Sequence, residues 1–498
     1  MAATLLTATA YANTSGHRQP GETYAREAAG PGSQGTNSAR GTWCSEGDAG
    51  RHLRTMAGQG RGTPSPLPVP PRLERIATQA REYPEMAFTT LAHHLDVAML
   101  ADAFRRLNPH SAPGVDRVTW RRYKENLASN LETLHEKLVN DTYSPQPVVR
   151  RLIPKSNGKL RPLGLPALED KIVAKAVAML LEAIYEQDFY DFSHGFRPGR
   201  SPHQALHEIR QGLLGSRMGQ GIDCDISSFF DNLQHDTLLA ILRKRINDGR
   251  VLELIELWLK AGILETGARV IHPDTGTPQG GVVSPVLANI YLHYALDLWF
   301  EKVVKPRCQG EALLSRYADD LVCAFRFRTD AGRFYQALPM RLGKFKLEVA
   351  PEKTRILRFS RFHPGRKRRF TFLGFEFFWT EDRQGVPRVK RRTARKKLQS
   401  ACQRIKEWIQ ANRHLPGKAF FSGLKARLRG HYSYYGVHGN SHALHRFFDW
   451  AMTCAFKWLN RRGGKRRSFS WKRFTQLLDA IPIERPRITE QSRRRVYA

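Results

Sequence analysis

Two short apolar segments that carry acidic residues constrain the fold of this chain more than any other feature. In residues 222–226, Asp223 and Asp225 alternate with apolar side chains, a pattern that predicts a short buried strand. In residues 316–322, Asp319 and Asp320 directly precede a second apolar run. A charged group set against an apolar core is costly unless something neutralises it. Because the two segments lie far apart in the sequence, only the fold can bring these acids to a common partner.

A divalent cation would neutralise such acids. Mg²⁺ prefers a few carboxylate oxygens and leaves the rest of its coordination shell to water and substrate phosphates. Two such ions, roughly 4 Å apart, can activate a 3′-hydroxyl and stabilise a leaving pyrophosphate during nucleotidyl transfer. Each acidic segment alone is weak evidence, because an isolated Tyr-Ala-Asp-Asp is more often a solvated turn.

The net charge points to a polyanionic partner. The 498 residues include 80 Lys and Arg against 46 Asp and Glu, which gives a formal net charge of +34. Such an excess repels itself unless counterions or nucleic acid neutralise it. A protein that merely coats phosphates would show the same charge, so charge alone does not separate an RNA-binding protein from an enzyme.

The cysteine pattern and the hydropathy suggest a cytoplasmic protein that does not enter a membrane. The six cysteines are scattered and form no CxxC pair, which argues against a disulfide framework and against a paired-cysteine zinc site. No apolar run approaches the roughly 20 residues that a membrane span needs. The N-terminus lacks the cationic start and the long apolar centre of a secretion signal.

The chain has three regions of different character. Residues 1–71 are rich in Gly, Ser, Pro and Arg, and we expect them to be disordered in isolation. Residues 72–378 mix helical patterns, which begin near Leu73, with strand patterns. A strand over 149–154, a tight turn and a return strand over 160–163 predict a hairpin, and helices are expected over about 170–185 and 282–300. Beyond Val389 the pattern turns helical and strongly basic.

Other segments could supply what polymerisation needs besides metal. Lys155 and Arg161 lie on the predicted hairpin, where cations can clamp phosphates, although a solvated basic turn would look the same. Gln279 precedes two glycines whose backbone can approach a nucleotide closely, although such a loop is commonly just the start of a helix. Phe230 follows Asp225 closely enough for its ring to press on the sugar of an incoming nucleotide; otherwise it is a core aromatic.

In this order, the segments resemble the reverse transcriptases of group II introns, over roughly residues 85–490. The segments that carry the resemblance are residues 111–116, 153–164, 192–201, 222–231, 277–285, 316–322, 351–354 and 372–375. The resemblance implies a metal site formed by the carboxylates of Asp225, Asp319 and Asp320 and the backbone carbonyl of Ile226, with two Mg²⁺ ions. It also implies a nucleotide site formed by Lys155, Arg161, Phe230, Gln279 and Lys353, and a primer grip at residues 372–375.

The C-terminal third resembles the thumb of the intron maturases, with its clearest signature at residues 428–436. Cations among aromatic residues suit RNA, because cations meet phosphates while rings stack on bases or pack helices together. Most of these aromatics could equally be core residues, which is the preferred interpretation of Trp408 and Trp458. The expected RNA-binding residues are Arg429, His431, Tyr432, Tyr435, Arg461, Arg462, Lys472 and Arg473.

Together these observations predict an α+β right-hand polymerase. Its fingers and palm would span residues 72–378, followed by an α-helical thumb or maturase domain over 379–498. It would bind group II intron RNA, aid splicing, and copy an RNA template from a DNA primer at target DNA. No HNH endonuclease pattern follows the thumb, so we expect it to use an existing 3′-end.

Three alternatives stay open at this point, and the sequence does not determine the oligomeric state. A domesticated reverse transcriptase would have the same polymerase and differ only in genomic context. A splicing maturase without catalysis is disfavoured by the intact acids Asp225, Asp319 and Asp320. An RNA-dependent RNA polymerase is disfavoured by Phe230, which would clash with a ribonucleotide.

Overall fold

A computed structural model describes residues 69–154, 160–215, 218–264, 270–271, 275–277, 280–362, 368–462 and 469–490. All of these residues belong to one compact unit. Nearly all of the expected N-terminal extension, together with Lys155 and Gln279, lies outside the described residues, as does the side chain of Arg161.

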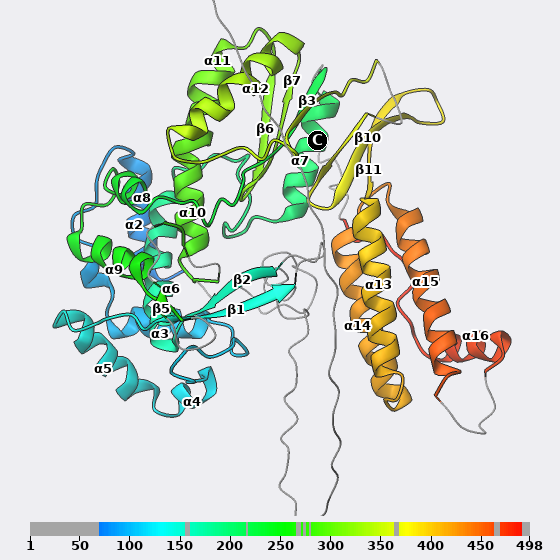
Figure 1. Ribbon diagram of the computed structural model, residues 1–498, viewed down its shortest axis with the longest axis horizontal. Coiled ribbons are helices and arrows are strands. Elements are labelled where there is room, and N and C mark those ends of the chain that lie inside the picture. Colours follow the sequence, from blue (N-terminus) through cyan, green and yellow to red (C-terminus); the bar gives the residue numbers. More distant parts are fainter. Residues whose placement is uncertain are drawn as a thin grey trace, which may run out of the picture. The chain divides into compact units, whose positions relative to one another are not determined.

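Helices alternate with short sheets along the chain, which confirms the α+β class (Figure 1). The helices are α2 (Pro71–Glu82), α3 (Val97–Arg106), α4 (Trp120–Glu125), α5 (Leu127–Val139), α6 (Leu168–Tyr185), α7 (Pro202–Gly215), α8 (His235–Leu242), α9 (Gly249–Lys260), α10 (Ser284–Leu292), α11 (Lys305–Arg307), α12 (Arg328–Gly343), α13 (Arg395–Asn412), α14 (Gly417–Tyr435), α15 (Ser441–Leu459) and α16 (Trp471–Ala480). The shorter helical turns are the 3-10 helix η1 (Ala92–His94) and the π-helical η2 (His293–Asp297) and η3 (Phe300–Val304).

The strands form three sheets. They are β1 (Val148–Pro154), β2 (Leu160–Leu165), β3 (Gln220–Asp225), β4 (Ile263–Leu264), β5 (Val270–Ile271), β6 (Ala312–Tyr317), β7 (Asp320–Phe325), β8 (Arg355–Arg358), β9 (Arg369–Phe372), β10 (Phe375–Glu381) and β11 (Pro387–Thr393). The sheet orders are β2-β1-β4-β5, β6-β7-β3-β8 and β11-β10-β9. All pairings are antiparallel except that of β1 with β4.

Helix α6 is the centre of the N-terminal helices. Its side chains are buried on almost every face, and α2 and α3 pack against it. A helix that is apolar all round is stable only inside a core. The predicted helix over 170–185 is therefore confirmed, and Asp170 within it is buried and accepts a hydrogen bond from the Tyr143 hydroxyl at 2.7 Å.

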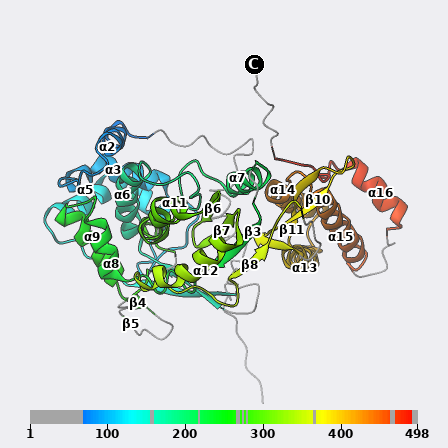
Figure 2. The same cartoon turned by 90° about the horizontal axis from the view of Figure 1, so that it is seen from above.

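The sheet β6-β7-β3-β8, here called the acidic sheet, has a helix on each face. Successive side chains of a strand point to opposite faces. In β7, Leu321, Cys323 and Phe325 face the large core that includes α12, whereas Val322 and Ala324 join a second core with α7 and the sheet β11-β10-β9. Viewed from above, β10 and β11 lie between the acidic sheet and α13 (Figure 2).

Helices α13, α14, α15 and α16, here called the basic bundle, form their own core of aromatic and aliphatic side chains. The bundle starts at Arg395, later than the sequence pattern suggested, because β11 continues to Thr393 with alternate residues buried. The expected boundary between residues 378 and 379 falls inside β10. The helix expected over 282–300 continues through η2 and η3 to Val304.

None of the helices within the described ranges is both long enough and apolar enough to cross a membrane.

Candidate active site

Strand pairing brings the two acidic segments together. β3 and β7 pair antiparallel, and the register sets Asp225 directly across from Asp320. β6 and β7 form a hairpin in which Tyr317 pairs with Asp320, so Ala318 and Asp319 make its turn. Directly opposed residues in antiparallel strands have Cβ atoms about 4.5–5.5 Å apart. The carboxylates of Asp225, Asp319 and Asp320 therefore gather at one end of the acidic sheet.

The hairpin turn is held by a close approach of backbone from residues 192–201. Ala318 has φ 56°, a left-handed conformation that is uncommon for residues other than glycine. Gly195 lies against this turn, and a Cβ atom there would come within 2.2 Å of the Ala318 nitrogen. Only glycine leaves room for the turn at this distance. Residues 192–201 thus shape the acidic site.

Arg316 anchors the same turn from inside the core. Its side chain is fully buried and forms a bidentate pair with Asp297, Nε to Oδ1 at 2.8 Å and Nη2 to Oδ2 at 2.5 Å. Arg316 Nη1 also donates to the Ala318 carbonyl at 3.1 Å, and Nη2 donates to Ser193 Oγ at 2.7 Å. Asn289 accepts from Arg316 at 3.1 Å and donates to the Gly195 carbonyl at 2.6 Å. One buried cation therefore links the acidic turn to its neighbours.

Burial and nearby negative charge raise the pKa of two aspartates in the acidic sheet, Asp320 and Asp223. Asp320 begins β7 and remains exposed to solvent, next to Asp319 and across from Asp225. Desolvation, followed by the charges of Asp319, Asp225 and Asp223, raises the pKa of Asp320 to about 7. Desolvation also raises the pKa of Asp223 to about 6, against the favourable charge of Arg355. A cation at this end of the sheet would relieve both costs.

Lys353 supplies a positive charge beside the acids in this structure. Its ammonium group forms an ion pair with Asp225 Oδ2, and this contact raises the pKa of Lys353. The ammonium comes from the loop after Val349, which lies beside β3 because Val349 forms a bridge with Ile226. The two hydrogen bonds of that bridge join Ala350 to Asp225 and Ser227 to Glu348, so the bridge itself does not engage the Ile226 carbonyl.

The carboxylates of Asp225, Asp319 and Asp320 are the type of ligand that Mg²⁺ prefers. In their present conformations, no three His, Cys, Asp or Glu side chains of the described ranges are grouped closely enough to hold a metal ion. The three aspartates nevertheless offer the hard carboxylate oxygens that Mg²⁺ prefers. Their mutual repulsion and the ammonium beside Asp225 both indicate a place where positive charge is stabilising.

Comparison with known proteins agrees with this site. The family described as reverse transcriptase (RNA-dependent DNA polymerase) matches residues 153–377, which include all three aspartates. Protein YkfC of Escherichia coli (strain K12) is 35% identical over 308 residues, which cover 56% of this chain and 78% of YkfC. The group II intron-encoded protein LtrA of Lactococcus lactis subsp. cremoris is 40% identical over 228 residues, 44% of this chain and 37% of LtrA. Nuclear intron maturase 1, mitochondrial, of Arabidopsis thaliana is 36% identical over 120 residues, 24% of this chain and 17% of that protein.

The chain belongs to the group II intron reverse transcriptase and maturase family. It is an enzyme with an RNA-dependent DNA polymerase domain. The matched region of this reverse transcriptase spans less than half of LtrA, so the activities of that longer protein do not transfer by similarity alone.

Phe230 lies beside Thr277, in the segment that leads to Gln279. Its ring packs edge-on against Phe229, with centroids 5.4 Å apart, and remains partly exposed. The Thr277 amide donates to the Phe230 carbonyl at 2.9 Å, which places the segment leading to Gln279 beside it. Gln279 itself lies outside the described residues.

The residues expected to bind RNA separate into two groups in the basic bundle. The aromatic residues pack inward: Tyr432 is 1% exposed in the bundle core, the His431 ring stacks on Phe447 with centroids 3.7 Å apart, and Tyr435 packs on Phe375. Tyr432 therefore has no face on which a base could stack, and we correct its expected role to packing. Desolvation lowers the pKa of His431 to about 3, so its ring is neutral near pH 7.

The cationic members lie on the surface of the bundle. The side chains of Arg461, Arg462, Lys472 and Arg473 are exposed. The side chain of Arg429 is exposed as well, but it forms an ion pair with Glu484 at 2.7 Å. The first four side chains suit phosphate contacts better than Arg429, whose charge is already matched.

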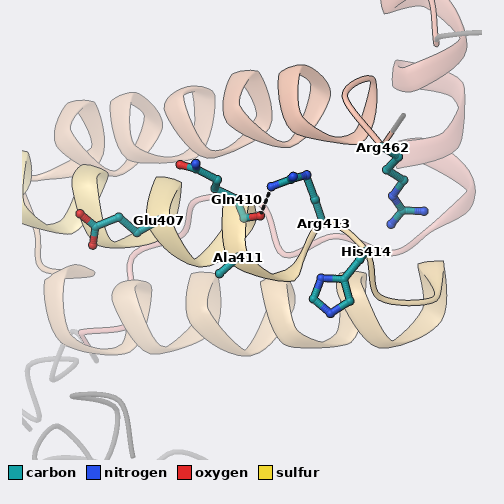
Figure 3. Close-up of a pocket in the computed structure, with 6 residues that line it drawn as sticks. All are labelled: Glu407, Gln410, Ala411, Arg413, His414 and Arg462. Carbon is teal, nitrogen blue, oxygen red and sulfur yellow. Dashed lines mark hydrogen bonds between the residues drawn. The ribbon is translucent and has the colours of Figure 1, made fainter. Parts of the chain in front are cut away.

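A hollow at one end of the bundle is lined by Glu407, Gln410, Ala411, Arg413, His414 and Arg462 (Figure 3). The labelled His414 and Arg462 lie toward the same end of it, and Arg413 donates to the Gln410 carbonyl at 2.9 Å. The guanidinium groups of Arg413 and Arg461 each lie 5.4 Å from the centre of the Trp458 ring. Trp458 is thus a partly buried packing residue, as its pattern suggested, and it organises two of these cations.

Proposed function

We propose that this reverse transcriptase copies RNA into DNA by two-metal nucleotidyl transfer at Asp225, Asp319 and Asp320. The observation that carries the proposal is the register of β3 and β7, which sets Asp225 across from Asp320 beside the turn that holds Asp319. Two Mg²⁺ ions, when bound there with the Ile226 carbonyl as a further ligand, would activate the primer 3′-hydroxyl and stabilise pyrophosphate.

The nucleotide would be bound by residues around this end of the sheet. The Lys353 side chain is 60% exposed and can leave Asp225 when another cation takes its place, which makes it available to the triphosphate. Lys155, Arg161 and Gln279 complete the proposed nucleotide site.

Phe230 is the proposed sugar gate of the site. Its partly exposed ring next to the nucleotide loop supports a steric block to a 2′-hydroxyl. Phe230→Ala is expected to raise incorporation of ribonucleotides relative to deoxynucleotides. An unchanged preference in competition assays would refute the gate.

We also propose that the basic bundle is the thumb and maturase region and binds group II intron RNA. The bundle exposes Arg461, Arg462, Lys472 and Arg473 around a compact aromatic core, so its charge is available to a phosphate backbone. In this role the protein would aid splicing of the intron and then copy it into DNA at the target during retrohoming.

The state of the cysteines supports a reducing compartment, and we propose the cytoplasm. Cys224, Cys308, Cys323, Cys402 and Cys454 are all free thiols. Burial raises the pKa of Cys224 to about 11, so this thiol is protonated and unreactive near pH 7.

Primer extension tests the catalytic proposal. Purified protein, Mg²⁺, deoxynucleotides and a DNA primer on an RNA template are compared with the same reaction of Asp319→Ala. We expect synthesis by the wild type and none above background by the variant, because the variant lacks one carboxylate of the metal site. Equal synthesis by both proteins would refute the assignment, and a folded, RNA-binding wild type without synthesis would favour a splicing-only maturase.

A further inference from the structure

The end of α14 lies at a junction between the acidic sheet and the basic bundle. Tyr434 belongs to the segment whose resemblance suggested RNA binding, but its ring is partly buried in the second core, with Tyr317, Leu373 and Phe375. The rings of Tyr434 and Phe375 stack with centroids 5.8 Å apart. Tyr434 thus contacts sheet residues on one side while its helix contributes to the bundle core on the other.

The Tyr434 hydroxyl holds the turn between β9 and β10. This two-residue turn consists of Leu373 and Gly374, with φ of 50° and 78°, and left-handed values at both positions are typical of a tight hairpin turn. Tyr434 Oη donates to the Leu373 carbonyl at 2.9 Å. A Cβ atom on Gly374 would lie 3.2 Å from Tyr435 Oη, so the second tyrosine closes over the same turn. The turn carries the expected primer grip.

A contact with α7 links the Tyr434 backbone to the acidic sheet. His203 Nε2, near the start of α7, lies 2.7 Å from the Tyr434 carbonyl oxygen, which can only accept this hydrogen bond. α7 packs on β6, the strand that leads into the acidic turn. Burial, with smaller effects from the charges of Tyr435, Tyr317 and Asp320, raises the pKa of Tyr434. The charge of Lys397 on α13 opposes, but does not cancel, the rise in the pKa of Asp320.

We propose that Tyr434 is a positioning residue for nucleotide addition, which fixes the β9–β10 turn, and with it the primer 3′-end, relative to the aspartates. The proposal rests on the polymerase function proposed above. Its physical basis is a chain of contacts: Leu373 is held by the Tyr434 hydroxyl, and the Tyr434 backbone is held by His203 beside the acidic sheet. Loss of the hydroxyl would leave the ring packing in place and loosen only the turn.

The test is single-turnover addition of one deoxynucleotide to a DNA primer on an RNA template, with full-length protein and Mg²⁺. Tyr434→Phe is compared with Tyr123→Phe, which also removes a hydroxyl that donates to a backbone carbonyl, that of Asn130 at 3.2 Å, but between α4 and α5. The rate constant, the reaction amplitude, the Kd for primer–template and the melting temperature are measured for each protein.

For Tyr434→Phe we expect the rate constant to fall about three- to tenfold, because the variant loses the one hydrogen bond that positions the turn. Its amplitude, its Kd for primer–template and its melting temperature should stay close to wild type, because the ring still packs. Tyr123→Phe should leave the rate constant unchanged. A rate constant for Tyr434→Phe equal to wild type would overturn the proposal, as would a loss confined to amplitude and melting temperature, which indicates a merely structural residue. Absence of synthesis by the wild type would instead refute the polymerase function.

Discussion

The acidic sheet and the basic bundle hold their charges in opposite ways. Behind the acidic sheet, Arg316 and Asp297 are both fully buried, and each satisfies the other inside an apolar core. In the basic bundle the core is built from aromatic and aliphatic side chains, and cations such as Lys472 and Arg473 lie on the surface.

Buried charge therefore suits the fixing of a geometry, whereas exposed charge suits affinity for a polyanion. A buried ion pair tolerates one arrangement, because displacement of either partner leaves an unpaired charge in the core. Exposed cations remain solvated, move freely, and act together on a polyanion through counterion release. The acidic sheet therefore uses buried charge to fix the positions of a few atoms, whereas the bundle presents many exposed cations.

The largest effect is expected where the buried pair is broken. Asp297→Asn leaves Arg316 as an uncompensated cation in the core, which should lower the free energy of unfolding by about 3–5 kcal/mol. Denaturant titration measures the change. Arg105→Ala, which breaks an exposed pair with Asp102 on α3, is the control and should cost less than about 1 kcal/mol. If the two substitutions cost the same, the contrast between buried and exposed charge fails.

An intermediate effect is expected when the pH is lowered, because protonation of His431 should destabilise the bundle. Burial, with a smaller effect from Arg404, holds the pKa of His431 at about 3, below its usual value of about 6.5. The unfolded chain therefore binds a proton that the folded bundle excludes, and stability is lost as the pH falls below about 6.5. Between pH 7 and pH 5 this loss should reach at most about 2 kcal/mol.

His431→Phe, which keeps a ring on Phe447, should remove that part of the pH dependence in urea titrations at the two pH values. His442→Gln changes an exposed histidine of the next helix and serves as the control. Equal acid sensitivity of wild type and His431→Phe would show that the ring is protonated in the folded bundle.

The smallest effect per residue is expected at the bundle surface. Lys472→Ala and Arg473→Ala should each weaken RNA binding and reduce the slope of log affinity against log salt by roughly 0.7 if the RNA contacted is single-stranded. Binding titrations between roughly 50 and 200 mM salt measure the slope. Arg105→Ala is again the control, and a slope that responds equally to all three changes would mean that the bundle surface is not the RNA interface.

Sequence reasoning succeeded where a signal is local. Strand β3 and helix α6 follow from alternation and from an apolar run, whereas the register that sets Asp225 across from Asp320 came only from the structure. It was less accurate at β11, where alternating Arg and Lys resemble the start of a basic helix although Val389, Arg391 and Thr393 are buried. The ion-pair partner of Arg391, Glu490, lies 99 positions away, and no local pattern shows it.

The sequence by itself therefore supplied the candidates: acidic residues in two apolar segments, Phe230 shortly after one of them, and a basic C-terminal third. Only the tertiary structure decided which candidate side chains are available. His431 and Tyr432 belong to the bundle core, and Tyr434 joins two regions, because helix packing selects one face of α14 and sequence composition does not. Likewise the approach of Gly195 to Ala318 and the pairing of Arg316 with Asp297 depend on distances between segments that only the folded chain defines.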